Sequence, residues 1–146
     1  DIGPWGPVVL SELPAAGAAS RFLAAVDTLD ALGDHRVAIP AYEAAVRQWP
    51  TEPLAWFALG NNRAALGQNL AAESAYREVL RLAPGDLPAR NNLALLLARR
   101  GCRTAALATL GPARAAAADG PFAAELAGSL REIQAGEDRA ADCASP

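Results

Sequence analysis

Apolar residues recur along this chain with the spacing of one face of a helix. In seven successive stretches they stand at positions i, i+3, i+4 and i+7, and short segments with glycine, proline or polar residues separate the stretches. This spacing predicts amphipathic α-helices. The expected helices span residues 20–32, 36–48, 53–66, 70–82, 87–99, 103–117 and 121–134.

A second pattern is a repeat of 34 residues. This interval separates the members of four sets of markers: Gly33, Gly67 and Gly101; Ala38, Ala72 and Ala106; Tyr42 and Tyr76; Pro50 and Pro84. Glycine ends a helix by adopting a left-handed conformation that other residues resist, and proline disfavours helix in the residue before it. The repeat therefore predicts three helix pairs, in residues 19–52, 53–86 and 87–120.

The markers resemble those of the tetratricopeptide repeat (TPR). The second unit has the aromatic, Leu-Gly, small, aromatic and proline positions of that family: Trp56, Leu59, Gly60, Gly67, Ala72, Tyr76 and Pro84. The first unit matches at Phe22, Gly33, Ala38, Tyr42, Ala45 and Pro50, and the third at Leu93, Ala94, Gly101, Ala106 and Ala113. The third unit lacks the aromatics and the terminal proline.

The resemblance implies an all-α fold, an α-solenoid of three TPR helix pairs in a domain of residues 19–135. The helix expected over 121–134 begins at Pro121 and acts as a cap on the last repeat. Residues 136–146 form a C-terminal tail. Pro40 lies inside the second expected helix, so we expect a kink there or a late helix start near Ile39.

Residues 1–18 do not belong to the repeats. They are a flexible leader, or an extended segment that packs on the helices or ends an upstream domain. Their W-x-PVVL-x-x-LPA stretch is similar to a junction in bacterial papain-like cysteine peptidases of the bacteriocin-processing type. That resemblance implies a C-terminal repeat domain whose catalytic residues lie outside this chain. The chain has no methionine, so we expect a mature product or a piece of a longer protein.

The composition and net charge of the chain narrow the classes of function that we expect for it. Apolar residues make up 52% of the chain, enough for a core, and the net charge is −3 with 13 arginines and no lysine. A nucleic-acid binder needs a basic face, so we expect no nucleic-acid partner. No apolar run reaches about 18 residues, so we expect no membrane span.

The two cysteines leave two alternatives open. Cys102 and Cys143 are either unrelated thiols or a disulfide that ties the tail to the body. A disulfide would place the protein in an oxidising compartment such as the periplasm or outside the cell, and free thiols would favour the cytoplasm. With one histidine and no CxxC spacing, we expect no metal and no cofactor.

The chain offers no set of catalytic residues. His35 is the only histidine, and it follows a turn where a solvated side chain is usual. Two repeats separate it from Cys102, which is too far for a nucleophile and its base. We therefore expect no enzymatic activity in this chain itself.

The resemblance implies that the first helix of each pair lines a concave groove. The groove residues expected are Leu23, Asp27, Leu54, Phe57, Asn61, Asn91, Asn92, Leu95 and Arg99. An asparagine amide can both donate to and accept from a peptide backbone. Asn61 and Asn92 resemble two asparagines of the family's carboxylate clamp, but the clamp's basic positions are not filled. The alternative is that both asparagines bond to neighbouring helices.

Three functions follow as hypotheses. The first is a protein-interaction module that binds a peptide or partner segment in the groove. The second is the repeat domain of a cysteine peptidase. The third is an array that self-associates through incompletely capped end helices.

Overall fold

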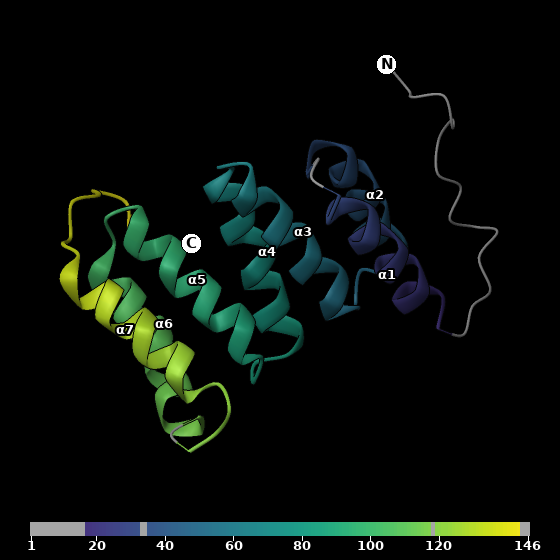
Figure 1. Cartoon of the computed structure of the whole chain (residues 1–146). Helices are drawn as coiled ribbons and strands as arrows, with labels where there is room; N and C mark the ends of the chain where they lie inside the picture. Colours follow the sequence, from purple (N-terminus) through teal and green to yellow (C-terminus); the bar gives the residue numbers. More distant parts are fainter. Residues whose placement is uncertain (1–16, 33–34, 118, 144–146) are drawn as a thin grey trace. The chain divides into compact units, whose positions relative to one another are not determined.

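A computed structural model describes residues 17–143 except 33–34 and 118, and in these residues it contains seven helices and no strand (Figure 1). The all-α prediction is confirmed, and every helix lies within two residues of its expected limits. The helices are α1 (Ala18–Asp30), α2 (His35–Gln48), α3 (Pro53–Ala65), α4 (Asn69–Leu82), α5 (Leu87–Arg99), α6 (Arg103–Ala116) and α7 (Ala123–Ala135).

The chain divides into two compact units, Asp1–Ala75 and Tyr76–Pro146, with the division inside α4. Unit 1 holds α1, α2, α3 and the start of α4. Unit 2 holds the end of α4, the helices α5, α6 and α7, and the segment that follows them. The predicted limits of the domain and of its three repeats remain predictions.

In unit 1, α1 packs against both α2 and α3, and α2 packs against α3. The core of this unit consists of buried side chains that point inward from the three helices: Leu23, Val26, Ala38, Tyr42, Ala45, Val46, Ala55, Ala58 and Leu59. Four of the nine are alanines, which let the helices approach closely. The rings of Phe22 and Trp49 meet at the edge of this core with centroids 5.7 Å apart.

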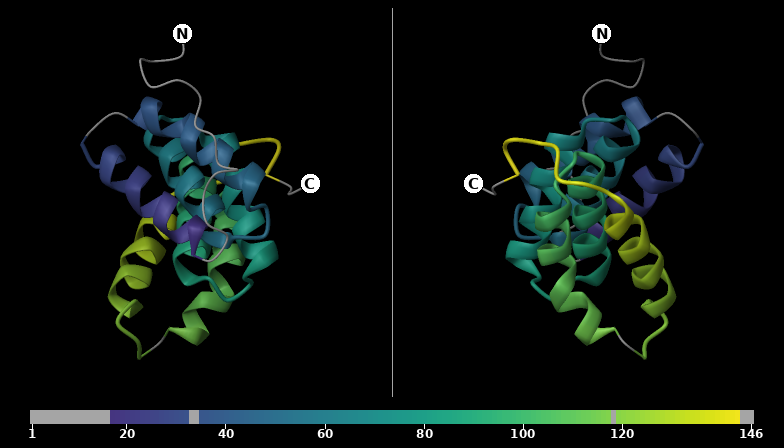
Figure 2. Two further views of the ribbon diagram at one scale, coloured as in Figure 1. Left: turned by 90° about the vertical axis from the view of Figure 1, so that its right-hand side faces the viewer. Right: turned by 90° about the vertical axis from the view of Figure 1, so that its left-hand side faces the viewer.

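In unit 2, α5 packs against α6 and α7, and α6 packs against α7. Because α5 packs on both neighbours, more of its residues are buried than of either α6 or α7. The buried apolar side chains of the three helices include Leu93, Leu97, Ala106, Leu110, Ala113, Leu126 and Ile133. The segment after α7 returns over the turn between α5 and α6 (Figure 2).

The helix ends follow local sequence signals. Gly67 and Gly101 adopt positive φ values of 73° and 86°, as predicted, and Gly33 lies outside the described residues. Asp86 caps α5 by accepting a hydrogen bond of 2.8 Å from the backbone N–H of Ala89. The expected start of α7 at Pro121 is wrong: the N–H of Ala123 bonds to Gly120, so a turn precedes the helix.

Of the two alternatives expected at Pro40, a kink or a late helix start, the late start is wrong, because α2 begins at His35 and continues through Pro40. Proline lacks the N–H that would bond to the carbonyl four residues earlier, which belongs to Arg36. Both Arg36 and Pro40 are exposed, so water can replace the lost bond. The cost of proline in this helix is therefore reduced by its position on the surface.

Candidate functional site

The outer face of α3 is the candidate binding surface of unit 1. Leu54, Asn61 and Ala65 are exposed on this face, and Phe57 between them is half-buried. The opposite side of α3 is covered because α1 and α2 pack on it, and its buried residues include Ala55, Ala58, Leu59 and Asn62. With 46% of its surface exposed, Leu54 is one of the few large apolar side chains of the described chain that remain open to water.

The same face recurs at the same offsets in the other first helices. The equivalent positions of the first pair are Ser20 and Asp27 on α1 and Ala31 directly after it, and all three are exposed. On α5 they are the exposed Pro88 and Arg99 and the half-buried Leu95. Within each set the positions are seven and four residues apart, which places them on one side of a helix. The three faces differ in chemistry, because only α3 combines exposed leucine with an exposed amide.

The prediction of residues that line an open groove is wrong at two positions. Leu23 and Asn91 are each only 1% exposed, so neither lies on an open surface. They occupy equivalent positions, 68 residues or two repeats apart, on α1 and α5. The next helix but one covers each of them, since α3 packs on α1 and the capping helix α7 packs on α5. Phe57 is the equivalent residue of the second pair and is half-buried.

Asp27 is exposed, and its carboxylate also has a structural role. The buried hydroxyl of Tyr42 donates a hydrogen bond of 2.5 Å to its Oδ1 and joins α1 to α2. Burial, together with this bond to a carboxylate, holds the pKa of Tyr42 far above its usual range. Asp27 is therefore positioned by the hydroxyl of the repeat's own tyrosine.

A polar cluster lies close to this pair and was missed by the sequence analysis. The Nδ1 of His35 lies 2.8 Å from Oδ1 of Asp30, and Nδ2 of Asn62 donates to the same oxygen at 2.9 Å. Asn62 is 1% exposed, and its Oδ1 has no hydrogen-bond partner. The signal was weak because Asn61 and Asn62 are adjacent, and only the packing of α3 shows which amide is buried.

The face of α5 in unit 2 is more polar. Asn92 is half-buried and donates to the hydroxyl of Tyr76 at 3.5 Å. Burial raises the pKa of Tyr76 to about 12. Arg99 pairs with Glu132 of α7, with 3.2 Å between Nε and Oε1. The alternative that these asparagines bond to neighbouring helices therefore holds at Asn92, which contacts α4.

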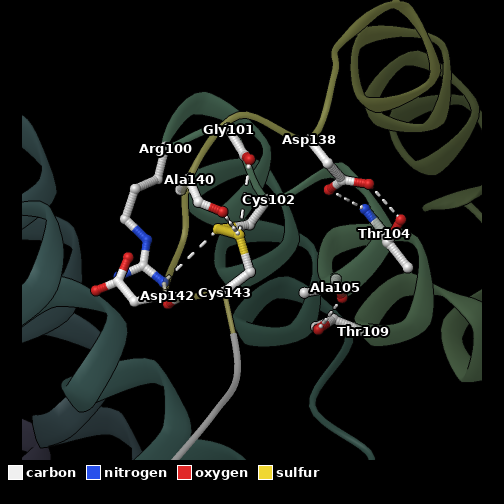
Figure 3. Close-up of a disulfide and its surroundings, with 10 residues drawn as sticks. All are labelled: Arg100, Gly101, Cys102, Thr104, Ala105, Thr109, Asp138, Ala140, Asp142 and Cys143. Carbon is white, nitrogen blue, oxygen red and sulfur yellow. Dashed lines mark hydrogen bonds between the residues drawn. A yellow bond between two sulfur atoms is a disulfide. The ribbon is translucent and has the colours of Figure 1, made fainter.

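The structure joins the two cysteines. Cys102 and Cys143, 41 positions apart, form a disulfide between the start of α6 and the segment after α7 (Figure 3). This is one of the two alternatives that the sequence left open. In the described residues no group of three histidine, cysteine, aspartate or glutamate side chains could hold a metal ion. None of the helices described is long and apolar enough to cross a membrane.

The helix pairs, the glycines that follow α3 and α5, and the recurring first-helix face resemble the helical repeats of the TPR class. The tetratricopeptide repeat family model matches residues 23–86, which cover the first two predicted pairs almost entirely. The TPR resemblance and the α-solenoid fold class are thereby confirmed. The similarity to a peptidase junction falls on residues outside those described, and it remains a prediction.

Solved structures of one bacterial protein share this fold. The type III secretion chaperone SycD of Yersinia enterocolitica, in complex with a peptide of the translocator YopD, has a TM-score of 0.75 and 18% identity, over 82% of this chain and 95% of that chain. A structure of the translocator chaperone SycD gives 0.76 and 18%, over 86% and 89%. Its alternative dimer gives 0.75 and 18%, over 82% and 94%. A search of curated proteins found no significant match.

Proposed function

We propose that this protein is a non-enzymatic interaction module that binds a peptide segment of another protein on the outer face of α3. The observation that carries the proposal is the combination of exposed Leu54, half-buried Phe57 and exposed Asn61 on one side of a first helix. The similar fold of SycD, which was solved with a translocator peptide, supports peptide binding as the general activity.

The chemistry of this face suits an extended peptide with apolar side chains. Complete burial of an exposed leucine or phenylalanine side chain is worth roughly 1.5–3 kcal/mol, and a partner would supply part of that value at the partly exposed Leu54 and Phe57. The Asn61 amide can donate to one backbone carbonyl and accept from one N–H, whatever the peptide's sequence. A binding mode of this kind takes its affinity from apolar anchors and its orientation from the amide.

Peptide selection from a random phage-displayed library on the immobilised full chain tests the proposal. The selected peptides are then synthesised and titrated against the wild type and the double variant Leu54→Ala/Asn61→Ala. We expect at least a tenfold weaker affinity for the double variant, since the loss of one apolar anchor and one amide removes about 1.4 kcal/mol or more.

Leu32→Ala is the matched control, because Leu32 is an exposed leucine (83%) that lies in the turn after α1 and not on α3. This variant should bind selected peptides within twofold of the wild type. The proposal fails if no peptide is enriched, or if Leu32→Ala weakens binding as much as the double variant does. Circular dichroism of each variant shows that its helices are retained.

We also propose that the protein works in an oxidising compartment, outside the cell or in the periplasm. The disulfide between Cys102 and Cys143 supports this, because such links persist where thiols are not kept reduced. Fractionation of the producing cells, with the redox state of both cysteines fixed by alkylation, tests it. Finding both thiols reduced in the cytoplasmic fraction would contradict it.

A further inference from the structure

We infer that the Cys102–Cys143 disulfide is a thiol-exchange site, at which an incoming thiol attacks Cys143 and Cys102 departs as the thiolate. The site would control the attachment of residues 137–143, which we call the strap. All the groups involved lie in unit 2, around the turn between α5 and α6 (Figure 3).

The strap is attached by backbone and side-chain bonds as well as by the disulfide. The carbonyl of Gly101 accepts hydrogen bonds from the N–H groups of Arg139 and Ala140, at 2.8 and 3.1 Å. Asp138 accepts from the backbone N–H of Thr104 at 2.9 Å and also from its hydroxyl. Asp138 therefore caps α6 from a distant part of the sequence, since Cys102 at the N-cap position makes no side-chain cap bond.

The two sulfurs differ in access to solvent. Cys102 is fully buried at 0% exposure, whereas Cys143 is half-buried. An attacking thiolate must reach one sulfur in line with the bond that it breaks. The exposure therefore directs the attack to Cys143.

The surroundings of the two sulfurs also differ in charge. Cys102 precedes the first turn of the 14-residue helix α6, and a guanidinium nitrogen of Arg100 lies 3.7 Å from its Sγ. Both features favour a thiolate there. Sγ of Cys143 lies 3.3 Å from the carbonyl oxygen of Ala140 and 3.7 Å from that of Gly101, and these partial negative charges disfavour a thiolate on it.

Access and charge select the same direction of exchange. The incoming thiolate forms a bond to Cys143 Sγ, the bond between the two cysteine sulfurs breaks, and its electron pair stays on Cys102. A second thiolate then attacks the sulfur of the reagent in the mixed disulfide and leaves both cysteines reduced. The reductant is a small-molecule or protein thiol. Reduction would leave the strap held only by its hydrogen bonds. The Asp138 cap of α6 would then depend on those bonds alone.

Mapping the first exchange product tests the direction. The oxidised full chain is treated with 2-mercaptoethanol in native buffer, quenched with N-ethylmaleimide at short times, and analysed by peptide mass mapping. We expect the mercaptoethanol adduct on Cys143 and the maleimide on Cys102 in at least a fivefold excess over the reverse. Equal adducts, an excess on Cys102, or no exchange without denaturant would overturn the inference.

A second measurement tests the charge argument independently of access. In the fully reduced chain, the pH dependence of alkylation should give Cys102 a lower pKa than Cys143. Arg100→Gln should raise the pKa of Cys102 and slow the exchange severalfold, because a leaving thiol with a higher pKa departs more slowly. Arg99→Gln removes the same charge one residue earlier and should change neither value. A lower pKa at Cys143, or equal effects of the two variants, would count against the site.

Discussion

In unit 1, hydrogen bonds between pairs of side chains join neighbouring helices, and the bond between Tyr42 and Asp27 is one of them. Tyr42 is 2% exposed, and its hydroxyl has a carboxylate acceptor on the neighbouring helix. The sequence identified Tyr42 as a repeat marker and Asp27 as a groove residue, but it could not show that the two are bonded. Fifteen positions separate them, and only the packing of α1 on α2 brings them together.

Tyr42→Phe should lower the free energy of unfolding by about 1.5–3 kcal/mol, the usual contribution of a hydrogen bond to a charged group. The ring stays in place, so the loss reports the hydroxyl alone. Urea unfolding measures it. Asp27→Asn keeps an acceptor oxygen and should cost less, so an equal or larger loss in Asp27→Asn would contradict this assignment.

Asp138 gives the strap a dependence on pH. The hydrogen bonds from the side chain and backbone of Thr104 lower the pKa of Asp138 below its ordinary value of 3.8. A carboxyl with a lowered pKa in the folded state contributes stability that is present above the unfolded value and is lost as the pH falls through the folded value. Asp138→Asn removes this titration, so the difference in thermal midpoint between wild type and variant should shrink as the pH falls below about 4. A difference that stays constant down to pH of about 2 would contradict it.

The helices show how far local sequence determines the elements. Periodicity and the glycine and proline signals predicted all seven within two residues. The errors came from backbone bonding that periodicity does not encode. Pro40 is tolerated inside α2 because it lies on the exposed side, and Pro121 belongs to a turn because Ala123 bonds to Gly120.

Gly67 and Gly101 are the two left-handed glycines that follow first helices in the described residues, and their different surroundings make them a matched pair for substitution. A Cβ at Gly67 would have no neighbour within 4 Å, whereas at Gly101 it would lie 3.2 Å from Cβ of Arg139 in the strap. Gly67→Ala should therefore cost about 1–2 kcal/mol for its φ alone. Gly101→Ala should cost more in the oxidised chain, as measured by urea unfolding.

Reduction should bring the two glycine variants closer together, because a loosened strap can move away from the new methyl group. If Gly101→Ala and Gly67→Ala cost the same in the oxidised chain, the strap does not press on this turn.

At the scale of the whole molecule, the sequence predicted the class and only part of the site. Asn61 and Leu54 are exposed, while Leu23 is buried under α3 and Asn91 under the capping helix α7. Position in the repeat was assigned from the family, but burial depends on which neighbour packs on each helix. The disulfide was left as an alternative because no local signal shows which distant segments meet.

The disulfide should contribute strongly to global stability. It joins residues 41 positions apart, and the chain-entropy model gives about 4 kcal/mol for a loop of that length. Urea unfolding of the wild type with and without a reductant should show a loss of this order, whereas Cys143→Ser should be insensitive to the reductant. Equal midpoints for the oxidised and reduced wild type would show that the link does not stabilise the fold.

The most direct test of peptide binding on α3 is amide chemical-shift mapping of the isotope-labelled full chain with a peptide selected from the library. If the peptide binds on α3, the largest chemical-shift changes fall on Leu54, Phe57 and the side-chain amide of Asn61. We expect Leu54→Ala/Asn61→Ala to abolish these changes. Changes confined to α2 or to the α6–α7 pair, with α3 unaffected, would contradict it.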